Sequence, residues 1–230
     1  MRKRGARPSP RHRLAAARPH RITGETPDQW LWGPKKLSMW LNDVDGDCVT
    51  AEEAFAKAAV SDPELFITDG TVKGWATKNG VLNGADLTQV LDLMQSGGFQ
   101  QDGKTYDDGP FTSVDWTNAA ILQNAISQGP VKIGVAGDQL ENAVPDPPTN
   151  GWLATGFMED SNEDHCVSLC GYGPISWLAK HLHVDVPGGV DGTKPAYALF
   201  TWSSIGIIDV PSMLAITAEA WLRNPVTIVR

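Results

Sequence analysis

Two separated residues, Cys48 and His165, are of the types that together perform nucleophilic chemistry. Cys48 stands just before "TAEEAFAKAAV", a helical pattern from Thr50, so its thiol is expected at a helix N-terminus. The helix dipole and unpaired N–H groups at such an end favour the thiolate. His165 opens the apolar run "HCVSLCGYG", and an adjacent imidazolium would stabilise that thiolate further. A free cysteine is ordinarily a small buried hydrophobe, so position is what favours chemistry here.

The stretch "LNDVDGDC" before the helix also allows a calcium-loop interpretation. Asp43, Asp45 and Asp47 alternate like the oxygen ligands of an EF-hand, which also needs Gly at position 6 and a bidentate acid at position 12. Counted from Asp43, those positions hold Cys48 and Ala54, so the turn glycine and the strongest ligand are both missing. The sequence therefore favours a thiol site over a calcium loop. The same carboxylates should raise the pKa of the thiol and oppose the helix dipole.

The remaining histidines and cysteines give no metal or disulfide pattern. His181 and His183, in "AKHLHV", have no acidic or thiol cluster near them in sequence. Cys166 and Cys170 would lie about 13 Å apart along a strand, too far for a disulfide. Cys166 would also face away from His165, which argues against a zinc pair. No metal and no cofactor are expected, and a reducing compartment is favoured.

The charge is distributed unevenly. Residues 1–21 carry seven Arg and one Lys and no acid, which leaves 11 basic against 27 acidic residues and a net charge of −16 for the rest. We expect residues 1–26 to form a basic, flexible, solvated arm, in which Arg2–Arg21 could contact an assembly partner or a nucleic acid. No apolar stretch follows the arm, so no signal peptide is evident, and no run is long enough to cross a membrane. The expected location is cytoplasmic or within an assembled particle.

Helical patterns come first and strand patterns later. Helices are predicted from Thr50, over residues 84–98 with Leu87, Val90, Leu91 and Met94 on one face, and over residues 113–129 with Ala119, Leu122, Ala125 and Ile126 inward. Glu52 and Glu53 are expected in the first turn of the first helix, where its dipole favours acids. Strands are predicted for "PVKIGVA", "HCVSLCGYG", "AYALFTW" and "SSIGIIDVP". This order indicates an α+β fold with segregated lobes.

Several blocks, in the right order over about residues 41–206, make the chain resemble the papain-like cysteine proteases. "NDVDGDC" places Asn42 six residues before the thiol and Gly46 two before it, as in the family's nucleophile block. "NGADLTQVLDLMQSGGF" is similar to the family's "NGG…ALQ…GI" helix, and "ISQGPVKIGVAG" to its "GPV" strand. "DHCVSLCGYGP" is similar to "DHAVxxVGYGP", which maps the catalytic histidine to His165, and "YALFTWSSIG" to the strand that bears the third triad member.

The chain also departs from that family's pattern. Asn42 replaces the glutamine of the oxyanion hole and is a shorter amide. The orienting asparagine is absent, which leaves Thr201 as the nearest candidate and Trp202 as the aromatic shield. Asp164 is an alternative orienter, although neighbouring strand residues face opposite ways. The family's disulfides and an evident pro-segment are also missing.

The resemblance implies a papain-like fold of residues 27–230, with a mainly helical lobe over 27–110, a mainly antiparallel β lobe over 111–230 and a cleft between them. It implies a cysteine peptidase that hydrolyses peptide or related amide bonds of a peptide or protein substrate. Cys48 would attack, His165 would transfer protons, Asn42 would stabilise the oxyanion and Thr201 would orient the imidazole. Amide transfer uses the same pair and stays open. The alternative is a weakly active or inactive structural subunit of an assembly, for example a virus-like particle, anchored by the basic arm.

Overall fold

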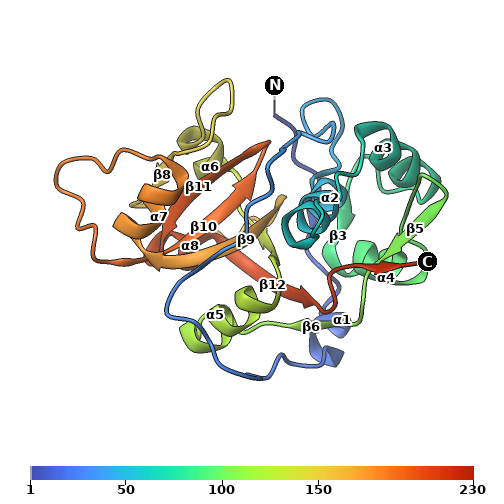
Figure 1. Cartoon of the computed structure of the whole chain (residues 1–230), viewed down its shortest axis with the longest axis horizontal. Helices are drawn as coiled ribbons and strands as arrows, with labels where there is room; N and C mark the ends of the chain where they lie inside the picture. Colours follow the sequence, from blue (N-terminus) through green and yellow to red (C-terminus); the bar gives the residue numbers. More distant parts are fainter. Residues whose placement is uncertain (1) are drawn as a thin grey trace.

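The molecule has a mainly helical lobe and a lobe built on a large sheet, as the sequence patterns predicted. In the computed structural model, which describes residues 2–230, one lobe is mainly helical and holds α2 (Cys48–Val60), α3 (Asp69–Lys78) and α4 (Leu87–Ser96). Figure 1 shows this lobe on the right and a larger sheet on the left. A small antiparallel sheet completes the helical lobe, in the order β13 (Ile228–Val229), β5 (Lys104–Asp107), β4 (Phe99–Gln101).

The second lobe is built on an eight-stranded sheet. Its main path runs in the order β6 (Phe111–Ser113), β12 (Thr217–Arg223), β7 (Val131–Val135), β9 (His165–Pro174), β10 (Pro195–Thr201), β11 (Ser204–Asp209), β8 (Leu153–Ala154). The neighbours pair antiparallel except β11 and β8, which are parallel. Its helices are α5 (Ala119–Gln128), α6 (Asp138–Ala143), α7 (Ile175–Leu182) and α8 (Val210–Ile216). The architecture is α+β.

The predicted inward faces of the helices are largely correct. Leu87, Val90, Leu91 and Met94 of α4 are all fully buried, because they recur at the spacing that places them on one face. In α5 the prediction holds for Leu122, Ala125 and Ile126 and fails for Ala119, which is exposed. Ala119 is the first residue of its helix, next to the Asn118 N-cap. The apolar face of α5 therefore begins one turn later than the pattern suggested.

Aromatic packing joins the two lobes. Phe55 of α2 stacks on Phe200 of β10, with ring centroids 3.9 Å apart and planes 2° from parallel. Trp40 packs edge-on against the same Phe200 ring. These residues belong to one buried cluster that also contains Cys48 and Cys166, so the start of α2 is fixed against the large sheet. Among residues 2–230, no helix is both long and apolar enough to span a membrane.

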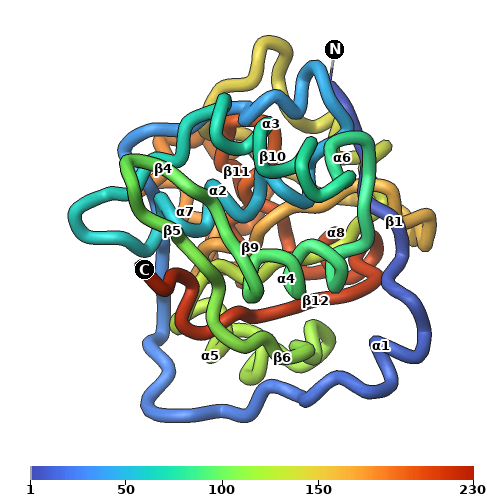
Figure 2. The backbone as a smooth tube through the Cα atoms, turned by 90° about the vertical axis from the view of Figure 1, so that its right-hand side faces the viewer, coloured from blue at the N-terminus to red at the C-terminus, as the bar shows by residue number. Residues whose placement is uncertain are grey.

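The segment before α2 makes contacts with both lobes. Its first part, with β1 (Ala6–Arg7) and α1 (Arg11–Ala16), runs from the N-terminus at the top of Figure 1 down to α1 at the bottom. β1 pairs with β3 (Ala85–Asp86) of the helical lobe, in parallel. Figure 2 shows the same segment descending along one side of the molecule before the chain turns across the base. The arm that the sequence predicted as flexible thus has a defined path here.

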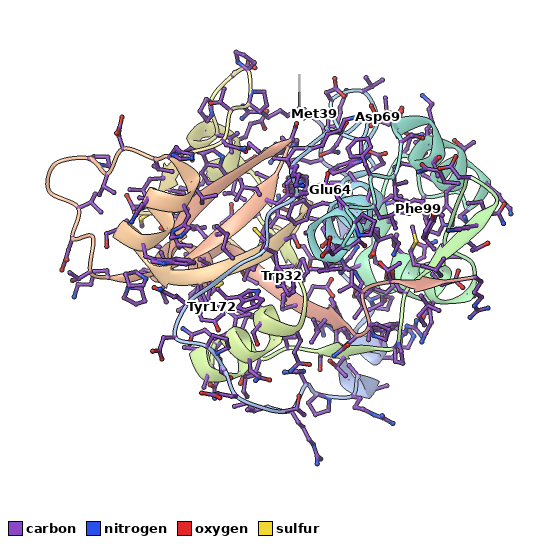
Figure 3. The ribbon with its side chains drawn as sticks, in the orientation of Figure 1. Trp32, Met39, Glu64, Asp69, Phe99 and Tyr172 are labelled. Atoms are coloured by element: carbon purple, nitrogen blue, oxygen red, sulfur yellow. The ribbon has the colours of Figure 1, made fainter. Side chains whose placement is uncertain are left out.

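The following connector crosses the lobe boundary that the sequence suggested. Its strand β2 (Trp30–Leu31) pairs with β9 of the large sheet, while β13, from the other end of the chain, belongs to the small sheet of the helical lobe. Trp32 donates from its backbone N–H to Cys170 O at 2.7 Å and from its ring to Ile126 O at 2.6 Å. In Figure 3, Trp32 lies beside Tyr172, and Met39 lies farther along the same connector near Asp69. The N-terminal connector therefore pairs with the lobe formed by the second half of the chain, and the C-terminal strand pairs with the lobe formed by the first half.

Candidate active site

Cys48 is the first residue of α2 and is buried, so its thiol lies at a helix N-terminus, as the sequence predicted. Residue 47, an aspartate, is the N-cap residue, but its side chain makes no capping hydrogen bond. The backbone N–H of Cys166, the residue after His165 on β9, lowers the pKa of the Cys48 thiol, and Cys48 and Cys166 belong to one buried cluster. Helix α2 packs against strand β9, so the predicted nucleophile and the predicted base lie on neighbouring elements.

His165 is the first residue of β9, and two neighbours fix its buried ring. Its Nε2 lies 2.8 Å from Thr201 Oγ1, and its ring stacks on Trp202 with centroids 4.2 Å apart and planes 11° from parallel. Nδ1 is buried and makes no hydrogen bond to any residue in 2–230. With Nε2 engaged by Thr201, Nδ1 is the ring atom left to exchange a proton with a thiol.

The turn that presents Trp202 has an unusual backbone. Trp202 and Ser203 form the two-residue loop of the β10–β11 hairpin, and both have positive φ, 42° and 60°. Such a loop normally carries Asn and Gly, since a side chain at positive φ is strained. The strained pair is the one whose first member covers the His165 ring, and strain of this kind collects at functional sites.

Asp164, the alternative orienter, does not serve the imidazole. Its Oδ1 accepts from the Gly137 N–H at 2.9 Å, and its Oδ2 lies 2.8 Å from the Arg4 guanidinium. The geometry thus agrees with the expectation that neighbouring strand residues face opposite ways. Thr201 is the residue placed to orient His165.

Asn42 lies in the loop before α2 and is buried, but its amide is turned toward that loop. Its Nδ2 donates to Asp45 O over a long 3.4 Å, and its backbone O accepts from the Lys3 N–H at 2.9 Å. In this conformation the side chain makes no contact that identifies it as an oxyanion donor. That role stays a prediction, whereas the Cys48 N–H at the first turn of α2 is free of the helical ladder.

Residues 2–9, the first part of the arm, run beside Cys48 and His165. Ala6 N–H donates to Asp164 O at 3.1 Å, and Gly5 O accepts from Ala85 N–H at 3.0 Å, so the backbone bonds to both lobes. The N–H groups of Gly5 and Ala6 lower the pKa of the Cys48 thiol, so this part of the arm lies beside it. Trp202 Nε1 donates to Lys3 O at 3.1 Å. Sequence reasoning could not find these contacts, because most of them are made by the backbone.

At Gly5 the backbone of the arm passes very close to the backbone of Gly46. A Cβ on Gly5 would lie 1.8 Å from Gly46 O, which is backbone and has no room to yield. A Cβ on Gly84 would lie 2.9 Å from Gly5 O on the other side. Gly5, Gly46 and Gly84 therefore let three backbone segments pass so close to one another that none of these positions has room for a side chain.

This covered site favours the neutral form of both dyad members. Burial raises the pKa of the Cys48 thiol to about 11, with the Asp47 charge adding to it and the N–H groups of Cys166 and Gly5 opposing. Burial also lowers the pKa of His165 to about 3, and the Arg4 charge lowers it further. The effect of Asp47 on the thiol has the predicted direction, although burial is larger. At neutral pH the thiol and the imidazole are therefore both uncharged.

Sequence reasoning missed a cluster of buried charges beneath α2. It joins Glu52 and Glu53 to Lys132 of β7, at 3.0 and 2.6 Å, and to Arg223 of β12, at 2.8 and 3.1 Å. Asp108 pairs with Lys57 in the same cluster. The prediction that the two glutamates sit in the first turn is wrong, because α2 begins at Cys48, two residues earlier than expected. They point into the interface between the lobes, where burial requires partners.

The structure shows no metal site within residues 2–230: no three His, Cys, Asp or Glu side chains are placed to hold an ion. All three cysteines, Cys48, Cys166 and Cys170, are free and buried.

No family model and no curated protein matches the sequence, but solved structures match its fold. The Amb a 11 cysteine protease of ragweed pollen, in its proform, superposes with a TM-score of 0.62 at 12% identity, covering 91% of this chain and 72% of that one. Digestive procathepsin L 3 of Tenebrio molitor larval midgut gives 0.61 at 13% identity, covering 90% and 73%. The bromelain protease of Ananas comosus, in complex with the E64 inhibitor, gives 0.55 at 10% identity, covering 86% and 98%.

The chain therefore has the fold of the papain-like cysteine proteases, as the resemblance in its motifs implied.

Proposed function

We propose that the protein is a cysteine peptidase that hydrolyses peptide or related amide bonds with the Cys48–His165 dyad. The observation that carries the proposal is the meeting of α2 and β9. The thiol at a helix N-terminus lies at the start of the strand that holds a histidine, and Thr201 and Trp202 fix the ring of that histidine. The catalytic use of these residues is an inference from this geometry and from the fold.

The mechanism follows from the groups present. His165 Nδ1 would take the thiol proton, and the thiolate would attack the carbonyl carbon of the scissile bond. The Cys48 N–H, and Asn42 after a change of its side-chain direction, would donate to the oxyanion. The imidazolium would then protonate the leaving amine, and the acyl-enzyme would be hydrolysed by a water that His165 deprotonates. Thr201 and Trp202 would keep the ring in place through both transfers.

In the conformation described, the arm must leave before a substrate enters. Gly5 and Ala6 lie where a substrate backbone would have to pass, and the arm keeps both dyad members neutral. Departure of the arm would hydrate the site, so the pKa of the thiol would fall and that of the imidazole would rise. Catalysis is therefore coupled to release of residues 2–9.

The experiment opens the site in the full-length chain with Gly5→Leu, because even a Cβ at this position meets the Gly46 carbonyl. Overpacking of this kind costs about 1–3 kcal/mol, so alkylation of Cys48 by iodoacetamide, located by mass spectrometry, should accelerate by about tenfold or more. The Gly5→Leu variant should also hydrolyse peptides from a mixed library. His165→Ala in that background should slow hydrolysis by about 10²-fold or more, and Cys48→Ala should abolish it.

Ala15→Leu is the matched control, since it adds the same side chain to the arm at an exposed position of α1. It should leave the labelling rate at the wild-type value. If Gly5→Leu exposes Cys48 to alkylation but releases no product from any peptide of the library, the protein is not a peptidase.

The alternative of a structural subunit anchored by its arm gains no supporting contact. Residues 2–9 bond to the chain's own two lobes, and the exposed arginines of the arm are Arg7, Arg11, Arg18 and Arg21. An assembly partner for those residues stays a prediction.

A further inference from the structure

Arg4 of the arm lies in a slot lined by acidic side chains next to the dyad. Its guanidinium lies 2.8 Å from Asp164 Oδ2 and 3.7 Å from Glu141 Oε2, and it also pairs with Asp138. Three carboxylates thus surround one guanidinium, which is more than an ordinary surface ion pair provides. Planar, charge-assisted contacts of this kind are what select arginine over other cations.

The slot is shaped for the stem of that side chain as well as for its charge. A Cβ on Gly137 would lie 2.6 Å from Arg4 Cδ and 3.0 Å from His165 Cβ, so the missing side chain is what leaves room for the methylenes. Gly137 also donates its N–H to Asp164 Oδ1 at 2.9 Å, which holds the carboxylate in position. One glycine therefore both admits the ligand and orients one of its partners.

Helix α6 supplies the other two carboxylates. Asp138 and Glu141 lie three residues apart in its first turn, on the same side of the helix. The slot stays open to solvent on one side, because the side chains of Arg4 and Asp164 remain 27% and 30% exposed. A side chain arriving from another molecule could enter the same space once the arm has left.

The slot adjoins the reacting atoms. Asp164 precedes His165 in the chain, and its backbone O accepts from the N–H of Ala6, which also approaches the Cys48 thiol. A residue bound in the slot is therefore within one or two residues of the bond that Cys48 would attack.

We propose that Asp138, Glu141 and Asp164 form a subsite for a basic side chain, so that substrates are peptides with Arg or Lys beside the scissile bond. Arg4 occupies this subsite in the covered state, as the arm's own ligand. The inference rests on the proposed peptidase function for the meaning of the subsite, but its binding chemistry is testable without hydrolysis.

The test measures binding to the full-length Gly5→Leu/Cys48→Ala protein, whose own arm is displaced and which performs no cleavage. The probe is a fluorescein-labelled octapeptide, RKRGARPS, with the sequence of residues 2–9, followed by fluorescence anisotropy. Replacing the residue of the peptide that corresponds to Arg4 by Gln should weaken binding by about tenfold or more, since it removes charge-assisted hydrogen bonds. Lys at that position should recover part of the loss.

The matched control peptide replaces the residue corresponding to Arg7, which is exposed and makes no ion pair in the structure of residues 2–230. It has the same net charge as the Gln peptide above and should bind nearly as well as the parent. On the protein, Asp138→Asn/Glu141→Gln should remove the preference for the parent peptide. Glu159→Gln/Asp185→Asn, an equal change of charge elsewhere, should preserve it.

Equal losses for the two Gln peptides would overturn the subsite, because only the net charge would then matter. If the parent peptide does not bind, the proposal is tested in the full-length chain by the rate at which Cys48 is alkylated. The Arg4→Gln variant should react about tenfold faster than the Arg7→Gln variant, and equal rates overturn the proposal. If the parent peptide binds more tightly than the peptide with Gln at the Arg4 position, but the Gly5→Leu variant hydrolyses no peptide, the subsite is supported and the peptidase function is refuted. If that variant hydrolyses peptides but the two peptides bind equally, the peptidase function is supported and the subsite is refuted.

Discussion

The imidazole of His165 is held by a hydroxyl and an indole, with no carboxamide or carboxylate on its ring. Thr201 Oγ1 accepts from or donates to Nε2 at 2.8 Å, and Trp202 covers the face of the ring. A hydroxyl is a weaker partner for an imidazolium than an amide oxygen would be, because it is smaller and free to rotate. The stacked indole compensates by excluding water from that bond. Thr201 is therefore a positioning residue, acting through His165.

Thr201→Val removes this partner and preserves the shape of the side chain. In the Gly5→Leu background we expect kcat to fall by about tenfold, the effect of losing one hydrogen bond that orients a charged ring. The alkaline limb of the pH–rate profile should also move to lower pH, since the imidazolium loses an acceptor and its pKa falls. Steady-state kinetics from pH 5 to 10 provide both readouts.

Thr201→Ser is the control, because it retains the hydroxyl and should preserve both kcat and the position of the limb. A Thr201→Val enzyme with lower kcat and an unshifted limb would indicate a packing role for Thr201 and no hydrogen bond to the reacting imidazole.

At the scale of elements, amphipathic spacing predicted more than any local motif. Helix α4 was predicted with its whole buried face, because four apolar residues repeat at helical spacing. Helix α7 was missed in "ISWLAKHL", although Ile175, Leu178 and Ala179 are buried at the same kind of spacing. Elements of two turns give too few repeats to separate helix from loop.

The path of the arm was not predictable from its own residues. Eight charges in 21 residues indicate a solvated tail, and the contacts that place the arm are backbone hydrogen bonds and glycine contacts. Backbone groups are the same in every residue, so the sequence does not show which of them will pair. Cys48, His165 and Thr201 could be predicted from family-like motifs, whereas the position of residues 2–9 beside them could not.

Two neighbouring carboxyls, Glu219 and Glu163, are buried near Ser9 of the arm. Glu219 of β12 accepts from Ser9 N–H at 3.0 Å, and Glu163, just before β9, packs over Gly134 of β7. Burial raises the pKa of Glu163 to about 9, helped by its hydrogen bond to Glu219 and by the nearby charges of Glu219 and Asp86. At neutral pH Glu163 therefore keeps its proton.

Glu163 should make the folded chain less stable in alkali. Its pKa is higher in the folded than in the unfolded state, so its contribution is full below about pH 4.5 and is lost as the pH rises toward 9. Glu163→Gln keeps a donor toward Glu219 but does not titrate. We expect the melting temperature of the wild type to fall more steeply than that of Glu163→Gln between pH 6 and 9, measured by scanning calorimetry. Parallel curves would mean that the pKa of Glu163 is not raised in the folded chain.

At the scale of the whole molecule, one charge cluster links the parts of the chain that form the site. Its six residues come from α2, β7, β12 and the end of β5, and all are buried: Glu52, Glu53, Lys57, Asp108, Lys132, Arg223. Burial would raise the pKa of Glu53, but Arg223, Lys132 and Lys57 outweigh it and lower it to about 2. The three cations and the carboxylates balance only when both lobes are assembled. No local sequence pattern predicts such a cluster, because its residues are far apart in the sequence and come together only in the complete fold.

Lys132 is the member of this cluster that contacts the first turn of α2, where Cys48 lies. Its Nζ contacts Glu52 and Glu53 and also donates to Val49 O at 2.8 Å, in the first turn of α2. Lys132→Met leaves two carboxylates with only Arg223 to balance them, and breaking a buried ion cluster costs about 3–5 kcal/mol. We expect a loss of that size in the free energy of urea unfolding, whereas Lys180→Met, at an exposed position of α7, should change it by less than about 0.5 kcal/mol. Adding Glu53→Gln to Lys132→Met should recover part of the loss, because it removes one of the unbalanced charges. If the single and double variants lose equally, Lys132 acts through packing alone, and the position of Cys48 does not depend on charge balance between the lobes.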